Sequence, residues 1–193
     1  MTLTAATLAL ALSANAQAAT WSIDASHTRV GFKVRHLMVS WVQGEFADVS
    51  GTVEYDPAAP TKTGATVTVQ MASVDTRDAK RDEHLRSADF FDVAKHPTMS
   101  FTSKSVKQGA GQSLLVSGDL TIRGVTKPVT LTVDGLGQPV TDPWGNQRVG
   151  ASATATINRQ DFGVSWNGTL DSGGVVVGDD VQLVIDVELV AKK

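Results

Sequence analysis

Apolar and polar residues alternate with a period of two along most of the chain from Val30 onward. Val30, Phe32 and Val34 fall on one face of the first such segment, and Lys33 and Arg35 fall on the other. This pattern is typical of strands with one buried and one solvated face. Similar segments predict about eight strands, which cover residues 30–38, 44–55, 67–71, 98–106, 114–122, 131–133, 149–157 and 181–189.

Short stretches of turn-forming residues separate these segments, including Asp56-Pro57, Gly109-Ala110-Gly111 and Ser172-Gly173-Gly174. Parallel neighbours need long crossovers, so short connections indicate antiparallel strands. An all-β domain of this kind is either a sandwich or a closed barrel. A lipocalin-like eight-stranded antiparallel β-barrel is the favoured interpretation, because closure removes exposed sheet edges. One short helix is expected over residues 78–87, where Asp78 can cap the first turn.

The inward face of the predicted barrel carries several small residues. Ala151, Ala153 and Ala155 form the apolar face of one strand, and Gly118 lies in another. An eight-stranded barrel is either packed solid or holds one small ligand, and larger residues opposite could fill the gap. The inward face has almost no charge, so a ligand would be bound by apolar burial, worth ~0.8 kcal/mol per methylene. A long lipid chain suits such an interior better than a sugar or an amino acid.

The overall composition narrows the function classes. At 193 residues the chain is long enough for one domain with a sizeable core, and its net charge of −3 gives no reason to expect nucleic acid as a partner. There is no cysteine, which excludes disulfides and thiolate chemistry. The four histidines have no metal-ligand spacing, and Asp161-Phe162-Gly163 is interpreted as a turn. We therefore predict neither a metal site nor a catalytic residue.

The N-terminus has the outline of a signal peptide over residues 1–18. An apolar run from Leu3 to Leu12 precedes small residues that permit cleavage after Ala18 or Ala16, although no basic residue follows Met1. The run is too short to span a bilayer, and no later segment is longer. The prediction is export to the periplasm, without a transmembrane segment, of a mature domain over residues 19–193.

Two features could form a mouth for the barrel. His36 falls on an apolar strand face, either as a structural histidine or as a ligand contact. Arg81, Asp82, His84 and Arg86 lie on the predicted helix, where guanidinium groups could clamp a phosphate head group. Alternatively, they pair locally with neighbouring acids. The adjacent Phe90 and Phe91 cannot both face inward on a regular strand, so at least one should line or plug an opening.

Three separate stretches carry a resemblance to the YceI-like family of lipid- and polyisoprenoid-binding proteins, from about Trp21 to Val190. The stretches run from Asp24 to Phe46, from Arg81 to Phe101 and from Gly118 to Val129, and Asp161-Phe162-Gly163 also fits the family's pattern. His96 departs from the aromatic residue that many members have. The resemblance implies an extended lipocalin-like barrel, often dimeric, in the bacterial periplasm, with an isoprenoid lipid through its lumen.

The leading hypothesis is a non-enzymatic periplasmic carrier of an isoprenoid or related apolar lipid, quinone-like, polyprenyl or fatty-chain, with no other cofactor. The alternatives are an enzyme that uses His36 or His84 as general acid–base, and an envelope interaction protein with a filled barrel. The mouth candidates are Arg81, Asp82, His84 and Arg86. The lumen candidates are Val30, Phe32, Val34, His36, Val67, Val69, Phe90, Phe91, Phe101, Leu120, Leu131, Ala151 and Ala153.

Overall fold

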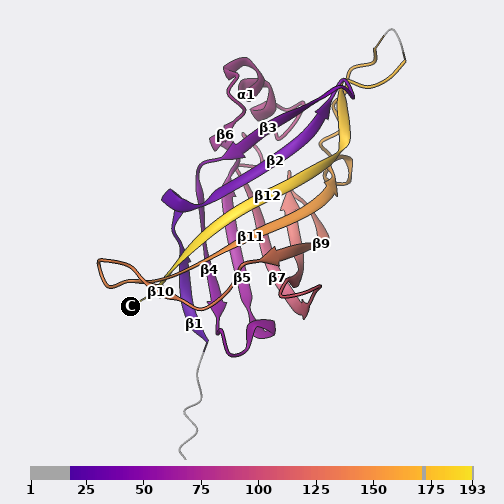
Figure 1. Ribbon diagram of the computed structural model, residues 1–193. Helices are drawn as coiled ribbons and strands as arrows, with labels where there is room; N and C mark the ends of the chain where they lie inside the picture. The colour runs from indigo at the N-terminus through magenta and orange to yellow at the C-terminus, as the bar shows by residue number, and fades with distance from the viewer. Residues whose placement is uncertain (1–17, 171–172, 193) are drawn as a thin grey trace, which may run out of the picture.

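A computed structural model describes residues 18–170 and 173–192, so the predicted signal peptide, apart from Ala18, lies outside the described residues. Within that part, one α-helix, α1 (Ala79–Arg86), accompanies a sheet of twelve strands (Figure 1). The described helices include none long and apolar enough to cross a membrane. The strands are β1 (Ala19–Ile23), β2 (Arg29–His36), β3 (Ser40–Phe46), β4 (Val49–Tyr55), β5 (Gly64–Gln70), β6 (Val74–Asp75), β7 (Thr98–Gln108), β8 (Leu114–Ile122), β9 (Val125–Asp134), β10 (Val140–Thr141), β11 (Gln147–Asn158) and β12 (Val177–Ala191).

Eight of these strands close into a ring in the order β1, β4, β5, β7, β8, β9, β11 and β12. The long strand β12 completes the ring, because it pairs with β11 from Asn158↔Asp180 to Arg148↔Val190 and with β1 from Trp21↔Ala191 to Ile23↔Leu189. Every pairing around the ring is antiparallel. The predicted eight-stranded antiparallel barrel with one helix is therefore confirmed.

Three further strands extend the wall at the end drawn uppermost in Figure 1, which we call the upper end. Beyond β1, strand β12 pairs with β2 from Asp186↔Arg29 to Val181↔Val34, and β3 and β6 follow in order. Residues 44–55 were expected to form one strand, but they form parts of β3 and β4 because the chain leaves the strand conformation at Ala47 and Asp48. The pattern also missed the short strands β1, β6 and β10.

The helix α1 begins where its sequence predicts. The Asp78 carboxylate accepts hydrogen bonds from the backbone N–H groups of Lys80 and Arg81, both at 3.1 Å, and so satisfies donors that the first turn leaves unpaired. Figure 1 shows α1 at the upper end, close to β6 and β3. The helix therefore lies beside one opening of the barrel.

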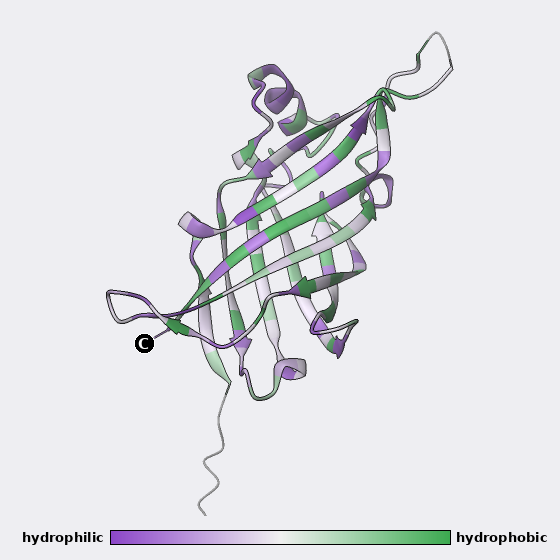
Figure 2. Cartoon of the chain, viewed as in Figure 1, coloured by the Kyte–Doolittle hydropathy of each residue, from purple (hydrophilic) through white to green (hydrophobic). Residues whose placement is uncertain are grey.

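The opposite, lower end is packed solid. Hydrophobic and hydrophilic residues alternate along many of the strands (Figure 2). At the lower end the buried residues include the large side chains of Trp21 and Tyr55. The Trp21 indole N–H donates to the Tyr55 carbonyl at 3.2 Å, and the Tyr55 hydroxyl donates to the Gly137 carbonyl at 2.9 Å. Leu189 beside them is only 1% exposed. We call this cluster the lower plug; it consists of Trp21, Val53, Tyr55, Val149 and Leu189.

Candidate functional site: an apolar lumen with one open end

Above the lower plug the barrel encloses three cavities in a row. The lower cavity measures about 170 Å³, and the upper cavity, about 110 Å³, shares Val30, Met99 and Leu183 with it. A mouth cavity of about 170 Å³ in turn shares Phe32 and Phe90 with the upper cavity. Because neighbouring cavities share lining residues, they lie in a row from the lower plug to the upper end, and we call this row the lumen.

Several side chains that face the lumen are not fully packed. Leu183, Ile185 and Val187 lie on the inward face of β12 and line the lower cavity, yet they are only half-buried. Side chains of a packed core would be fully buried. The filled barrel of the alternative hypothesis therefore does not describe this interior.

The structure places all the lumen candidates on the cavity walls. Val30 lines both the lower and upper cavities, and His36 lines the mouth cavity. Gly118 differs from expectation: a Cβ atom there would lie 2.6 Å from Cζ of Phe101, so the Phe101 ring occupies the space that we expected to remain open. The other candidates line the lower cavity (Val67, Val69, Phe101, Leu120, Leu131, Ala151, Ala153) or the upper cavity (Phe32, Val34, Phe90, Phe91).

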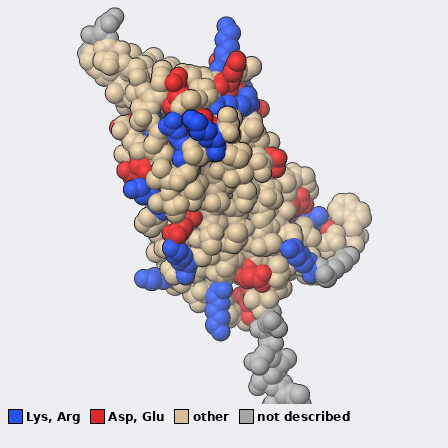
Figure 3. All heavy atoms as spheres, turned by 180° about the vertical axis from the view of Figure 1, so that it is seen from behind, with Lys and Arg blue, Asp and Glu red and all other residues tan. Residues whose placement is uncertain are grey.

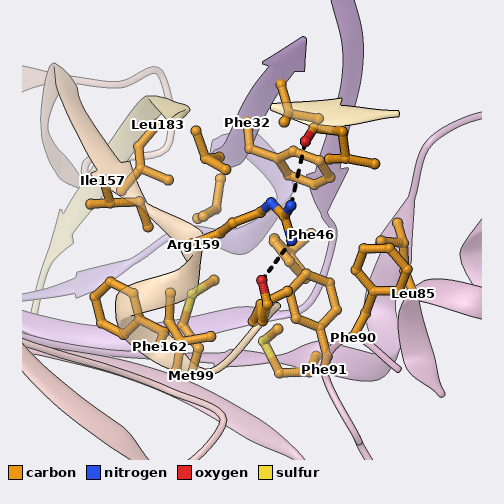
Figure 4. Close-up of a pocket in the computed structure, with 18 residues that line it drawn as sticks. Phe32, Phe46, Leu85, Phe90, Phe91, Met99, Ile157, Arg159, Phe162 and Leu183 are labelled. Carbon is orange, nitrogen blue, oxygen red and sulfur yellow. Dashed lines mark hydrogen bonds between the residues drawn. The ribbon is translucent and has the colours of Figure 1, made fainter. Parts of the chain in front are cut away.

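The expectation of an almost uncharged inner face misses one residue, Arg159, which follows β11 and lines the upper cavity. Figure 4 shows its side chain extending between Leu183 and Ile157 on one side and Phe46 on the other. The side chain is fully buried, at 5% exposure of the residue. The period-two alternation of this strand could have revealed Arg159. Ile157 faces inward, so the same face falls next on position 159.

Arg159 is occupied by hydrogen bonds to the chain around it. Its Nη1 donates to the carbonyls of Val164 (2.6 Å) and Trp166 (2.9 Å), and its Nε donates to the carbonyl of Gly178 (2.9 Å). Burial lowers the pKa of the guanidinium, and Asp179, whose Oδ1 lies 3.3 Å from Nη2, opposes that effect. Arg159 therefore fastens residues 164–166 to the start of β12.

Three rings narrow the path between the upper cavity and the mouth cavity. The His84 ring meets Phe90 and Trp166 edge-on, with centroids 4.9 and 5.0 Å away, and the Phe90 and Trp166 centroids are 5.1 Å apart. We call this cluster the aromatic constriction. It joins three elements, α1, the segment after it and the segment after Phe162, so its opening requires these elements to move apart.

Arg81, His84 and His36 surround the mouth cavity. Arg81 donates from Nε to the Thr76 hydroxyl and from Nη2 to the Thr76 carbonyl, both at 2.7 Å, which leaves its Nη1 group for other partners. His84 Nε2 lies 2.9 Å from Asp89 Oδ2. Within the described residues the His36 ring has no hydrogen-bond partner, so its nitrogens are available to a molecule in the mouth.

The other two mouth candidates, Asp82 and Arg86, do not line the mouth cavity. Asp82 is buried, and its Oδ1 accepts from the backbone N–H of Thr76 at 2.9 Å and from the Thr76 hydroxyl at 2.5 Å. Arg86 donates to the carbonyls of Ala72 (2.8 Å) and Val74 (2.7 Å). Both side chains hold α1 against the segment around β6.

An ion-pair network surrounds Arg148 at the lower end. Its guanidinium donates to Asp24 Oδ2 and Asp142 Oδ2, both at 2.7 Å, and to Glu188. The Ser26 hydroxyl and Arg148 hold the pKa of Asp24 well below its usual range, and Arg148 does the same for Asp142. Asp24, His27 and Glu188 are the only His and acidic groups in the described ranges that lie close enough to hold a metal. Arg148 already supplies their positive charge.

Comparisons with known proteins agree with this architecture. A family model for the YceI-like domain matches residues 21–189. Protein YceI of Escherichia coli O157:H7 is 44% identical over 181 residues, which cover 93% of this chain and 91% of that protein. The crystal structure of Burkholderia cenocepacia BcnA has a TM-score of 0.73 at 27% identity, over 86% of this chain and 98% of that one. A polyisoprenoid binding domain from Saccharophagus degradans shares the fold, with a TM-score of 0.65 at 17% identity, over 91% and 100% of the two chains.

Proposed function

This chain belongs to the YceI-like domain family, and from that premise we propose that it is a periplasmic carrier that holds the chain of an isoprenoid lipid in its lumen. The observation that carries the proposal is the row of three cavities, walled by apolar side chains and ending at the lower plug. The polyisoprenoid binding named for the Saccharophagus degradans domain supports the same ligand class.

The lining of the lumen sets the mode of binding. Only Thr28, Thr63 and Ser100 bring polar side chains to the lower cavity, and no charged residue lines it. Binding therefore depends on burial: ten methylene groups contribute roughly 8 kcal/mol before the costs of immobilising the ligand. The lipid enters tail first, because the lower end is filled. Its head group then lies in the mouth cavity beside Arg81, His84 and His36.

The periplasmic location rests on the sequence. Strand β1 begins at Ala19, so cleavage after Ala18 leaves every described strand complete. Charged side chains of both signs are interspersed over the face shown in Figure 3. Such a surface suits a carrier that stays in solution between donor and acceptor.

The lumen is tested by filling it. Ala151→Phe adds a ring on the inward face of β11, and Thr154→Phe adds one on the outward face of the same strand. Each protein is purified from bacteria, extracted with organic solvent and analysed by mass spectrometry. We expect an isoprenoid lipid near one equivalent in the wild type and in Thr154→Phe, and a strongly reduced amount in Ala151→Phe.

A wild-type extract without lipid, together with failure to take up added polyprenol, would contradict the carrier. Chemical conversion of the added lipid by the wild type, lost in His84→Ala, would instead support the enzyme hypothesis. His84 is the group to test because its contact with Asp89 orients the imidazole.

A further inference from the structure

We propose that the tip of the β2–β3 hairpin docks on the surface of an anionic phospholipid bilayer and brings the open end of the lumen to the membrane. The docking tip consists of Arg35, Met38, Val39 and Trp41. Arg35 also lines the mouth cavity, but the exposed side chains of Met38, Val39 and Trp41 do not line the lumen, so this inference goes beyond the carrier function proposed above.

The docking tip exposes apolar side chains to solvent. Val39 is 76% exposed, and Met38 and Trp41 are each 44% exposed. The described residues include six large apolar side chains with high exposure. Four of them lie at the upper end, namely the three above and Val175, and the other two, Val140 and Trp144, lie by β10. Single exposed apolar residues are common on proteins, but adjacent ones indicate contact with a partner or a membrane.

The turn that carries the docking tip has a backbone conformation that its residues rarely adopt. Leu37 and Met38, at the turn between β2 and β3, have φ values of 51° and 59°. Two-residue hairpin turns with positive φ strongly favour Asn and Gly, and aliphatic residues rarely adopt this conformation. A local conflict between sequence and backbone is expected at functional surfaces. The geometry of the turn therefore does not explain why its residues are apolar, whereas a contact made by this surface would explain it.

The charge of the hairpin is positive overall. Residues 29–46 carry Arg29, Lys33 and Arg35 and a single acid, Glu45, which pairs with Arg29 away from the tip. The guanidinium carbon of Arg35 lies 5.0 Å from the centre of the Trp41 ring. Tryptophan is enriched at the boundary between lipid chains and head groups, and arginine is attracted to anionic head groups there. The pair therefore has the chemistry of an interfacial anchor.

The docking tip is continuous with the mouth cavity. His36 is the last residue of β2 and lines the mouth. The backbone N–H of Leu37 donates to the carbonyl of Val176, another residue of that wall, at 2.8 Å. Figure 1 shows the hairpin turn at the upper end, beside the loop that leads into β12. A docked tip lets a lipid pass from the bilayer into the mouth without exposing its chain to water.

Vesicle flotation tests the docking tip. Val39→Asp combined with Trp41→Ser alters the tip, and Val140→Asp combined with Trp144→Ser makes the same changes in exposed residues at the lower end. Vesicles contain phosphatidylcholine alone or phosphatidylcholine with phosphatidylglycerol. We expect wild type and the control to float with the anionic vesicles. The tip variant should partition about tenfold less, because the interface disfavours an introduced carboxylate.

Lipid uptake separates this inference from the carrier function. The tip variant should take up polyprenol added in detergent as wild type does, but should load more slowly from vesicles. Loss of uptake from both sources in the wild type would contradict the carrier. Equal flotation of the tip variant and wild type, or no flotation of the wild type, would overturn the docking tip. A third outcome would also overturn it: the wild type and the control form dimers and do not bind vesicles, while the tip variant is monomeric. That result would identify the tip as a self-association surface.

Discussion

The two ends of the barrel are built from the same strands but have different interiors. Strand β11 contributes Val149 to the lower plug and then Ala151 and Ala153 to the hollow lumen, all on its inward face. At the lower end, Trp21 and Tyr55 are only 3% and 2% exposed; above it, inward side chains such as Leu183 and Ile185 are half-buried and line cavities. The alternation of side chains along a strand therefore decides which residues face inward, and the volume of those side chains decides whether the interior is solid or hollow.

The largest difference between the two regions should appear when one leucine is truncated in each. Leu189 borders the lower cavity but is only 1% exposed, so Leu189→Ala removes close-packed contacts of the lower plug and should lower the free energy of unfolding by about 2–5 kcal/mol. Leu183→Ala enlarges space that is already present and should cost about 1 kcal/mol. Urea denaturation of delipidated proteins measures both. Equal losses would mean that the lumen wall is packed as tightly as the plug.

A smaller effect should follow when contacts of the aromatic constriction at the upper end are removed. Trp166→Ala removes two ring contacts of the aromatic constriction, each worth about 0.5–1.5 kcal/mol. We expect an apolar fluorescent probe to leave the lumen about tenfold faster, measured by stopped-flow dilution, because exit requires those contacts to part. Trp144→Ala, in an exposed loop near the lower end, is the control. A release rate unchanged by Trp166→Ala would locate the exit elsewhere.

The smallest effect concerns pH and the lower end. The pKa values of Asp24 and Asp142 are lowered on folding, so their ion pairs with Arg148 stabilise the protein above pH ~4, and that contribution is lost as the pH falls further. Arg148→Met should be less stable at neutral pH and should lose less stability between about pH 5 and 3. Partial exposure of Arg148 limits the change. Denaturation at several pH values tests this, and parallel curves would contradict it.

Local pattern was sufficient for the barrel and for most of its lining. Alternation with a period of two assigns each residue to a face, so Val67, Phe101 and Leu131 could be placed inward without knowledge of the fold. The same rule reaches Arg159 only when it is continued two residues past Ile157, where the predicted strand ended. Strand β1 alternates as well, with Ala19, Trp21 and Ile23 on one face, but it was missed because strands were counted only from Val30 onward.

The parts of the site that pattern could not predict depend on contacts between distant segments. Arg81 and Arg86 are both on α1, and only the packing of the helix against β6 sends one to the mouth and the other to the carbonyls of Ala72 and Val74. The constriction likewise joins His84 to Trp166, far along the chain. No local periodicity encodes such pairings, and the predicted phosphate clamp of two arginines is not formed.

The lower plug also makes the lumen sensitive to the length of a bound chain. For the lipid proposed above, the tail would stop at Trp21 and Tyr55, so the number of carbons in its chain would determine how far the head group stands from the entrance. The head group of a short lipid would lie near the aromatic constriction, and that of a long one outside the mouth cavity. Closure of the lower end would thus make the position of the head group depend on the length of the lipid chain.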